Sequence, residues 1–215
     1  MLTAGYKVPV EEKAMNLAPY TDLLATDISD AQGAGHAMDI GIKSLLSPTP
    51  AIMGFAFTVR CTERSNTFMH DAIYSAPKGS IIVAEVDENN YAVAGGNVCA
   101  VAQQNGIAGF VIDGAIRDLG ELRSLNFPVF ARGVFPKPGG KGKSGESQVT
   151  INCGGVAVST GDLIVADEEG IVVIPQKEIE ETLATALEKQ QKAAAKPLAD
   201  WRANHEKMIS DIVNG

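Results

Sequence analysis

The sequence predicts an α/β domain built in layers, with a mixed sheet or a small barrel and with helices at its C-terminal end. Three observations lead to this prediction. Apolar runs and helical patterns alternate through the middle of the chain. The third quarter contains only short apolar runs separated by glycine-rich turns, and from residue 176 the pattern becomes helical. This mixture argues against a pure doubly wound fold, in which strands and helices alternate throughout.

The size and composition fit one globular domain with a helical tail. The chain has 215 residues, of which 45% are hydrophobic and 20% charged, so wholesale disorder is excluded. We expect a domain at 1–175 and a helical extension at 176–215 that packs on the same domain or on a neighbouring subunit. The formal net charge of −8 argues against a protein that binds nucleic acid through a basic surface. It does not exclude a small anionic substrate, because one arginine or one cation can reverse the charge of a pocket.

The cysteines and the N-terminus indicate a cytoplasmic protein. Cys61, Cys99 and Cys153 are widely spaced in apolar stretches, which is typical of buried free thiols in a reducing compartment. The apolar runs stay short of the roughly 18 residues that a membrane span needs. Residues 1–17 carry charges where a signal peptide needs an apolar segment. We therefore expect a cytoplasmic protein that does not bind membranes.

The local patterns predict the elements in order. Residues 22–46 have a helical pattern, although Gly33-Ala34-Gly35 weakens it in the middle. Asn97 is expected to cap a helix that ends at Asn105. The other expected elements are strands at 51–60, 80–87, 91–95, 109–113 and 128–132, helices at 66–75 and 117–125, a mobile loop at 133–148, short strands around 149–158, 162–166 and 170–174, and helices at 176–196 and from Pro197 toward Val213.

Gly95-Gly96-Asn97 is the first candidate binding segment. It follows an expected strand and opens an expected helix, which is the general layout for holding an anion on free backbone N–H groups. Glycine allows a ligand to approach the backbone closely. The segment lacks a complete dinucleotide fingerprint, so we set aside NAD and S-adenosylmethionine. An ordinary strand-to-helix turn remains the alternative interpretation.

The segment from Asp113 to Asp118 is the strongest local candidate. It begins just beyond the expected end of an apolar strand, where open α/β sheets tend to bind ligands. Asp118 could bind a hard cation such as Mg²⁺, and Arg117 could hold a carboxylate or an enolate. On a helical turn the two side chains would diverge by roughly 100° and line different walls of a pocket. The alternative is a surface Arg–Asp pair at the start of a helix.

Other motifs carry less information. Gly142-Lys143-Ser144 resembles the end of a phosphate-binding loop, but Lys137 stands where that motif needs glycine. A flexible surface loop is the better interpretation, and its lysines could still approach an anionic ligand. The three histidines, His36, His70 and His205, have no metal-ligand spacing, so we assign each a structural or surface role.

Several separate motifs, in the correct order, are similar to the RraA-like family. The run GGNVCAVAQQNGIAGFVIDGAIRDLGELRSLNFPVFARG (95–133) resembles the signature region of that family. Residues 25–33, 66–87 and 154–175 resemble its N-terminal helix start, its helix-turn-strand segment and its strand-rich closing segment. The family includes the 4-hydroxy-4-methyl-2-oxoglutarate aldolases and the regulators of ribonuclease E activity.

The resemblance implies a layered β/β/α fold of the swivelling-domain kind. It also implies a ring-shaped homotrimer, sometimes doubled to a hexamer, with a site between subunits. In the aldolases of the family, the backbone amides of the strand-to-helix turn and an arginine bind the α-keto acid, and the following aspartate carries Mg²⁺ or Mn²⁺. The corresponding positions here are Gly95, Gly96, Asn97, Val98, Arg117 and, for the metal, Asp118.

The chain departs from the aldolases at two acidic positions. They place an aspartate twenty-one residues before the arginine, where this chain has Gly96. They also have a glutamate in the C-terminal helix, roughly at 192–194, whereas Glu188 lies a turn earlier. The ribonuclease-regulating members tend to lack the metal aspartate, which this chain keeps.

The resemblance and the motifs together give two functional hypotheses. The first is a metal-dependent lyase that releases pyruvate from an α-keto acid or decarboxylates oxaloacetate, with Asp113 or metal-bound hydroxide as possible bases. A related enzyme with another small-acid substrate is a variant of it, which the change at Gly96 would permit. The second is a non-catalytic ring that binds and inhibits a ribonuclease or helicase.

Overall fold

A nine-stranded mixed sheet forms the centre of the molecule, seen in a computed structural model that describes residues 15–33 and 35–215. Seven strands follow one another across it in the order β1-β6-β5-β3-β2-β10-β11, while β4 pairs with β5 and β7 with β2. A separate two-stranded sheet contains β8 and β9. The strands are β1 (Lys43–Ser44), β2 (Ile52–Cys61), β3 (Ile81–Val86), β4 (Ala92–Ala94), β5 (Gly109–Ile116), β6 (Val129–Val134), β7 (Gly145–Ser147), β8 (Ile151–Cys153), β9 (Val156–Val158), β10 (Leu163–Asp167) and β11 (Gly170–Ile174).

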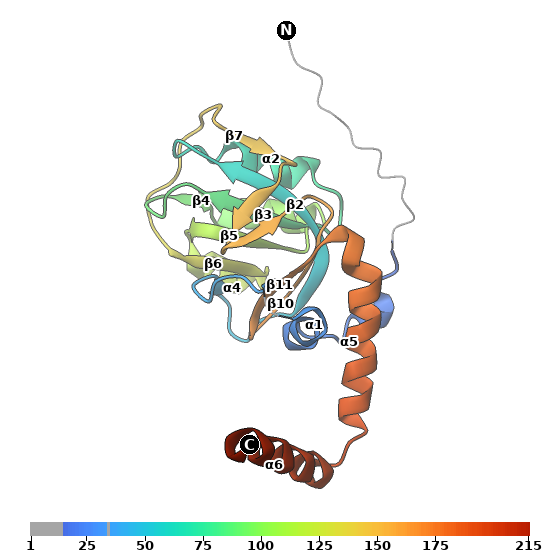
Figure 1. Cartoon of the computed structure of the whole chain (residues 1–215). Helices are drawn as coiled ribbons and strands as arrows, with labels where there is room; N and C mark the ends of the chain where they lie inside the picture. Colours follow the sequence, from blue (N-terminus) through green and yellow to red (C-terminus); the bar gives the residue numbers. More distant parts are fainter. Residues whose placement is uncertain (1–14, 34) are drawn as a thin grey trace.

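The main sheet is nearly closed into a barrel (Figure 1). Strands β2, β3, β5 and β6 are parallel to one another, whereas β10 and β11 continue the sheet in antiparallel pairs beside β2. The two edges come together through the segment before β2. Its β1 pairs with β6, and its Ala37 forms an isolated bridge with Val172 of β11. The mixed sheet or small barrel that the sequence predicts is therefore confirmed.

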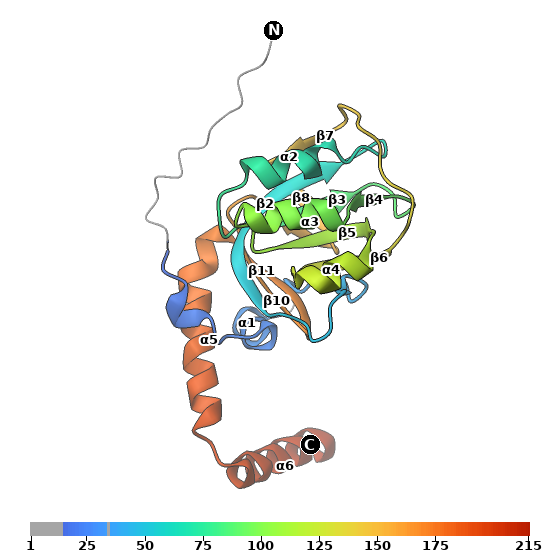
Figure 2. The same ribbon diagram turned by 180° about the vertical axis from the view of Figure 1, so that it is seen from behind.

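Three helices cover one face of the sheet: α2 (Thr67–Ser75), α3 (Gly96–Gln104) and α4 (Leu119–Leu125) (Figure 2). Buried side chains such as Met69, Cys99 and Leu122 anchor them to the first apolar core. A second core joins the sheet to β8 and β9. The layers therefore follow the order helix, sheet and second β layer, which confirms the expected β/β/α arrangement.

Two further helices lie against the antiparallel end of the sheet. These are α1 (Ala25–Gln32) and α5 (Ile179–Ala194), which share a third apolar cluster with β10 and β11. Short 3₁₀ turns precede both helices, at Ala18–Tyr20 and Gln176–Glu178. An apolar stripe on α5 packs into this cluster, since Ile179, Leu183 and Ala186 are all buried.

Helix α6 (Leu198–Asn214) stands away from the rest of the molecule (Figures 1 and 2). Every residue from 191 to 215 is exposed, including several large apolar side chains. These are Leu198, Trp201, Met208, Ile209, Ile212 and Val213. In the part of the chain that the structure describes, none of the helices is both long enough and apolar enough to cross a bilayer. Of the charged N-terminal segment at 1–17, residues 1–14 lie outside the described residues.

Two expectations for secondary structure were wrong. One helix does not run through 22–46, because Gly33 adopts a φ of 80° and ends α1 one residue earlier. Residue 34 lies outside the described residues. The expected loop at 133–148 contains β7, which pairs with the end of β2. The other elements lie within a few residues of their expected positions.

The three cysteines are buried and free, as their apolar surroundings predict. Burial raises the pKa of Cys61 and of Cys99 to about 12, and it also raises the pKa of Cys153. All three thiols therefore stay protonated at neutral pH. We assign them to the packing of the core rather than to catalysis.

Candidate active site

The two segments that the sequence singles out meet at one edge of the sheet. Gly95 directly follows β4, and Arg117 directly follows β5. The two strands are parallel neighbours, so their carboxyl ends lie at the same edge. The backbone N–H of Arg117 donates to the carbonyl oxygen of Ala94 at 3.0 Å. Pairing of two buried strands is thus what brings the segments together.

Asp118 connects the two segments through its side chain. Its Oδ2 atom accepts a hydrogen bond from the N–H of Gly96 at 3.2 Å and lies 3.4 Å from Nε of Arg117. The carboxylate therefore lies at the N-terminus of α3, where the helix dipole favours negative charge. The N–H groups of Asn97 and Val98 have no hydrogen-bond partner among residues 15–33 and 35–215. They remain available to a second anion.

The backbone at Asp118 explains this placement. The residue has φ 60° and ψ 41°, which is the left-handed region that aspartate enters more readily than most residues. Its carbonyl oxygen accepts the N–H groups of Glu121 and Leu122 and so begins α4. Leu122 is fully buried and fixes this helix to the core. A tight strand-to-helix turn therefore holds the carboxylate beside α3.

Gly95 permits the close approach of the two segments. A Cβ atom at this position would overlap with Oδ2 of Asp118 and would lie 3.0 Å from Cγ of Arg117. Because any larger residue would push both side chains away, glycine is needed here for space and not for an unusual φ. Gly96 is also closely packed, since a Cβ there would overlap with the carboxylate of Glu121.

Three expectations for the site need correction. Asn97 does not cap α3, because Gly95 is the N-cap residue and Asn97 lies in the first turn. Arg117 and Asp118 precede α4 rather than belonging to it. Their side chains therefore lie next to each other instead of diverging around a helix. Asp113 does not lie beyond the strand end, because β5 continues to Ile116.

Asp113 is committed to a separate ion-pair network. Its Oδ1 accepts a hydrogen bond from Nε of Arg132, and its Oδ2 accepts the N–H of Gly154 at 2.7 Å. Arg132 also contacts Asp39 at 2.8 Å. Because both oxygens of Asp113 are engaged with groups outside the site, the structure argues against this residue as the base.

A group of polar residues near Arg117 was missed in the sequence. Nζ of Lys141 lies 2.7 Å from Nδ1 of His70 on α2 and 2.8 Å from Oδ1 of Asn66. Burial, together with the positive charges of Lys141 and Arg117, lowers the pKa of His70 to about 4. His70 is therefore neutral at pH 7. Burial also lowers the pKa of Lys141.

One sequence signal could have found this group. Asn66 and His70 are four residues apart, so an expected helix at 66–75 places them on one face. The contribution of Lys141 comes from a loop seventy-one residues further along the chain. No local pattern indicates which side of the domain that loop covers.

The surroundings of Asp118 suit a hard cation that keeps water and substrate ligands better than a metal ion coordinated only by protein side chains. Within the described ranges, three or more His, Cys, Asp or Glu side chains do not gather as a possible metal cluster. Mg²⁺ usually keeps several water ligands and is bound through one or two carboxylates together with oxygen atoms of the substrate. The side chain of Asp118 is 36% exposed at the edge of the sheet, which leaves room for such ligands.

Glu188, the nearest glutamate to the position expected in the C-terminal helix, does not contribute to this site within one chain. Its carboxylate pairs with Lys192 on the exposed surface of α5, and this pairing lowers its pKa. The pair has the i,i+4 spacing of an ordinary helix-surface contact.

The comparisons with known proteins support the fold and the family. A family model described as "RraA-like: Aldolase/RraA" matches residues 25–173. The chain belongs to the RraA-like family. This RraA-like protein is 36% identical, over 200 residues, to a protein of Halalkalibacterium halodurans named "Putative 4-hydroxy-4-methyl-2-oxoglutarate aldolase". The match covers 90% of this chain and 95% of that relative.

Two solved structures are similar to this RraA-like protein. One is described as the RNA-processing inhibitor RraA from Thermus thermophilis, with a TM-score of 0.65 and 30% identity over 70% of this chain and 92% of that one. The other is an uncharacterized protein of Pseudomonas syringae, with a TM-score of 0.75 and 28% identity. That match covers 92% of this chain and 98% of the other. The predicted family and fold are therefore confirmed.

Proposed function

We propose that this RraA-like protein is a divalent-metal-dependent lyase that acts on α-keto acids. Its substrates are oxaloacetate, 4-hydroxy-4-methyl-2-oxoglutarate or a closely related acid. The observation that carries the proposal is the meeting of Arg117 and Asp118 with the free N–H groups at the start of α3. The aldolase name of the Halalkalibacterium halodurans relative supports the same class of reaction.

Both reactions need the same stabilisation. In each, the bond between C3 and C4 of the substrate breaks, and its electron pair moves onto the keto group to give the enolate of pyruvate. C4 leaves as CO₂ from oxaloacetate. From the hydroxy acid it leaves as a second pyruvate, after the 4-hydroxyl group loses its proton. A proton then returns to C3 of the enolate. A site that stabilises the enolate therefore catalyses both.

Different residues at the sheet edge can bind the substrate carboxylate, stabilise the enolate oxygen and hold the metal ion. In the turn from Gly95 to Val98, the free N–H groups of Asn97 and Val98 bind the carboxylate next to the keto group, while the N–H of Gly96 stays bonded to Asp118. Arg117 forms hydrogen bonds with this carboxylate and with the enolate oxygen, since a guanidinium offers aligned donors. Asp118 holds Mg²⁺ or Mn²⁺, which, when bound, acts as a Lewis acid toward the keto oxygen. Lys141, beside His70, adds a second positive group that suits a substrate with two carboxylates.

Turnover measurements test the proposal directly. Oxaloacetate and substituted 2-oxoglutarates are incubated with the protein, with Mg²⁺ or Mn²⁺ or with a chelator, and pyruvate is measured. We expect pyruvate to form faster than in protein-free controls, and only when the metal is present. Absence of turnover with every substrate in the presence of both metals would contradict the proposal.

The second candidate is a protein that binds and inhibits a ribonuclease or helicase. The likeness to the RNA-processing inhibitor from Thermus thermophilis favours it. Such an inhibitor would have no use for a cation at Asp118, so Asp118→Asn would leave inhibition unchanged. A lyase, by contrast, would lose its turnover with the same substitution. The two measurements on one variant therefore separate the candidates.

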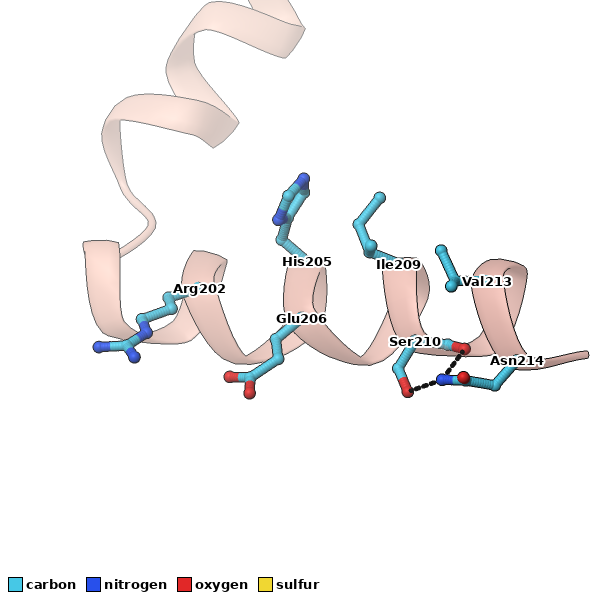
Figure 3. Close-up of a pocket in the computed structure, with 7 residues that line it drawn as sticks. All are labelled: Arg202, His205, Glu206, Ile209, Ser210, Val213 and Asn214. Atoms are coloured by element: carbon cyan, nitrogen blue, oxygen red, sulfur yellow. Dashed lines mark hydrogen bonds between the residues drawn. The ribbon is translucent and has the colours of Figure 1, made fainter.

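We also propose that the protein assembles as a homotrimer or a hexamer, partly through α6. One side of this helix carries His205, Ile209 and Val213 at a spacing of four residues (Figure 3). A shallow hollow runs along the helix and is formed by residues of α6 alone, so it is an uncovered helix surface rather than an enclosed pocket. Exposed apolar surface of this kind usually marks an interaction site.

Light scattering tests the assembly. We expect the wild-type protein to have the mass of three chains or a multiple of three at micromolar concentration. Trp201→Glu combined with Ile212→Glu should reduce that mass, because the two side chains are 50% and 71% exposed on α6. Circular dichroism should be unchanged, since α6 does not contribute to the described cores. A monomeric wild-type protein would contradict this prediction.

A further inference from the structure

The carboxylate of Glu121 fills the space where a side chain at position 96 would begin. An ideal Cβ atom on Gly96 would overlap with Oε2 of Glu121 and would lie 2.6 Å from its Cδ and 2.9 Å from its Cβ. Glu121 comes from the first turn of α4, whereas Gly96 is the first residue of α3. A side chain at position 96 would therefore require the exposed side chain of Glu121 to move from its present position.

The site consequently holds two carboxylates on either side of Gly96. Asp118 accepts the N–H of this residue, and Glu121 lies over its Cα. Two neighbouring carboxylates repel each other unless a positive charge is shared between them. Arg117 contacts Asp118, but the side chain of Glu121 forms no ion pair or side-chain hydrogen bond within residues 15–33 and 35–215. The two carboxylates, of Asp118 and Glu121, therefore have one positively charged partner between them, Arg117.

The negative charge and the oxygen atoms of these two carboxylates suit a hard divalent cation. Such a cation takes carboxylate oxygens directly or through its water ligands and completes its shell with water and substrate. Carboxylates that hold the water ligands of a metal matter nearly as much as the direct ligands. Both carboxylates sit on one tight turn, three residues apart, so the turn at Asp118 fixes their separation.

We propose that Glu121 supplies the second carboxylate of the cation site, from the space that a side chain at position 96 would otherwise enter. The inference rests on the proposed function, which assigns the cation to Asp118. The site then has two acidic groups, one on the turn at Asp118 and one on α4, although position 96 carries none. The carboxylate comes from α4 instead of α3.

Metal binding by matched variants tests this inference. Mn²⁺ affinity is measured by electron paramagnetic resonance and by calorimetry for the wild-type protein, Glu121→Gln and Glu180→Gln. The control removes one negative charge from the exposed surface of α5, away from the sheet edge. We expect Glu121→Gln to weaken Mn²⁺ binding roughly 10- to 100-fold, the range found for residues that support metal ligands. The control should bind Mn²⁺ as the wild-type protein does.

The outcomes separate this inference from the proposed function. Unchanged Mn²⁺ affinity in Glu121→Gln, together with its loss in Asp118→Asn, would overturn the role of Glu121 and leave the lyase proposal standing. An equal loss in Glu121→Gln and Glu180→Gln would be a general effect of net charge and would also overturn it. A wild-type protein that neither binds Mn²⁺ nor turns over oxaloacetate would instead defeat the proposed function. Glu121 is exposed and glutamine has the same shape, so the variant is expected to fold.

Discussion

Asp118→Asn is expected to abolish metal-dependent turnover and to leave the fold intact. A neutral amide is a much poorer ligand for a hard cation than a carboxylate. The loss of turnover should exceed the roughly 100-fold upper range for residues that only support a ligand. The side chain is partly exposed, and the amide oxygen of asparagine can still accept the N–H of Gly96. Thermal unfolding should therefore change little.

Calorimetry with Mn²⁺ and steady-state kinetics on oxaloacetate check this prediction together. Asp22→Asn is a matched control, because Asp22 is exposed and lies in the segment before α1. The control should keep wild-type metal affinity and rate. Unchanged Mn²⁺ affinity in Asp118→Asn would contradict the prediction. It would mean that Asp118 is only an acidic residue at the start of a short helix and not a metal ligand.

Much of the site could be predicted because its parts are local. Apolar strands ending at one sheet edge, followed by Gly95-Gly96 and by Arg117-Asp118, can each be recognised within a few residues of sequence. The parallel pairing of β4 and β5 then brings them together. The direction of the Asp118 side chain could not be predicted, because it depends on a left-handed backbone conformation that aspartate adopts only in some turns.

The contributions that were missed depend on packing between distant parts of the chain. Glu121 reaches the site only because α4 packs against the start of α3. Lys141 reaches it only because its loop contacts His70 on α2. Asp113 illustrates the opposite case. It is close to Arg117 in sequence, yet its partners are Arg132 and the backbone of Gly154, on another side of the fold. Proximity in sequence was therefore a poor guide to membership of the site.

Arg117→Lys is expected to reduce the rate strongly, although the charge is kept. A planar guanidinium can hold a carboxylate and an enolate oxygen with two aligned donors, whereas an ammonium group is a point charge. Loss of one preorganised donor at developing negative charge typically raises the barrier by about 2.7–4 kcal/mol, or roughly 10²–10³ in rate. Because the interaction strengthens as the enolate forms, we expect kcat to fall as well as KM to rise.

A purely structural role for Arg117 predicts a different result. The Arg117 and Asp118 side chains are 43% and 36% exposed, and an ion pair of this kind contributes at most about 1 kcal/mol to stability. The substitution would then shift thermal unfolding slightly and leave the kinetics unchanged. Arg123→Lys, an exposed arginine of the same helix region, controls for the general effect of the replacement. Wild-type kinetics for oxaloacetate in Arg117→Lys would mean that the pair only supports the turn, and the lyase proposal for this site would fail.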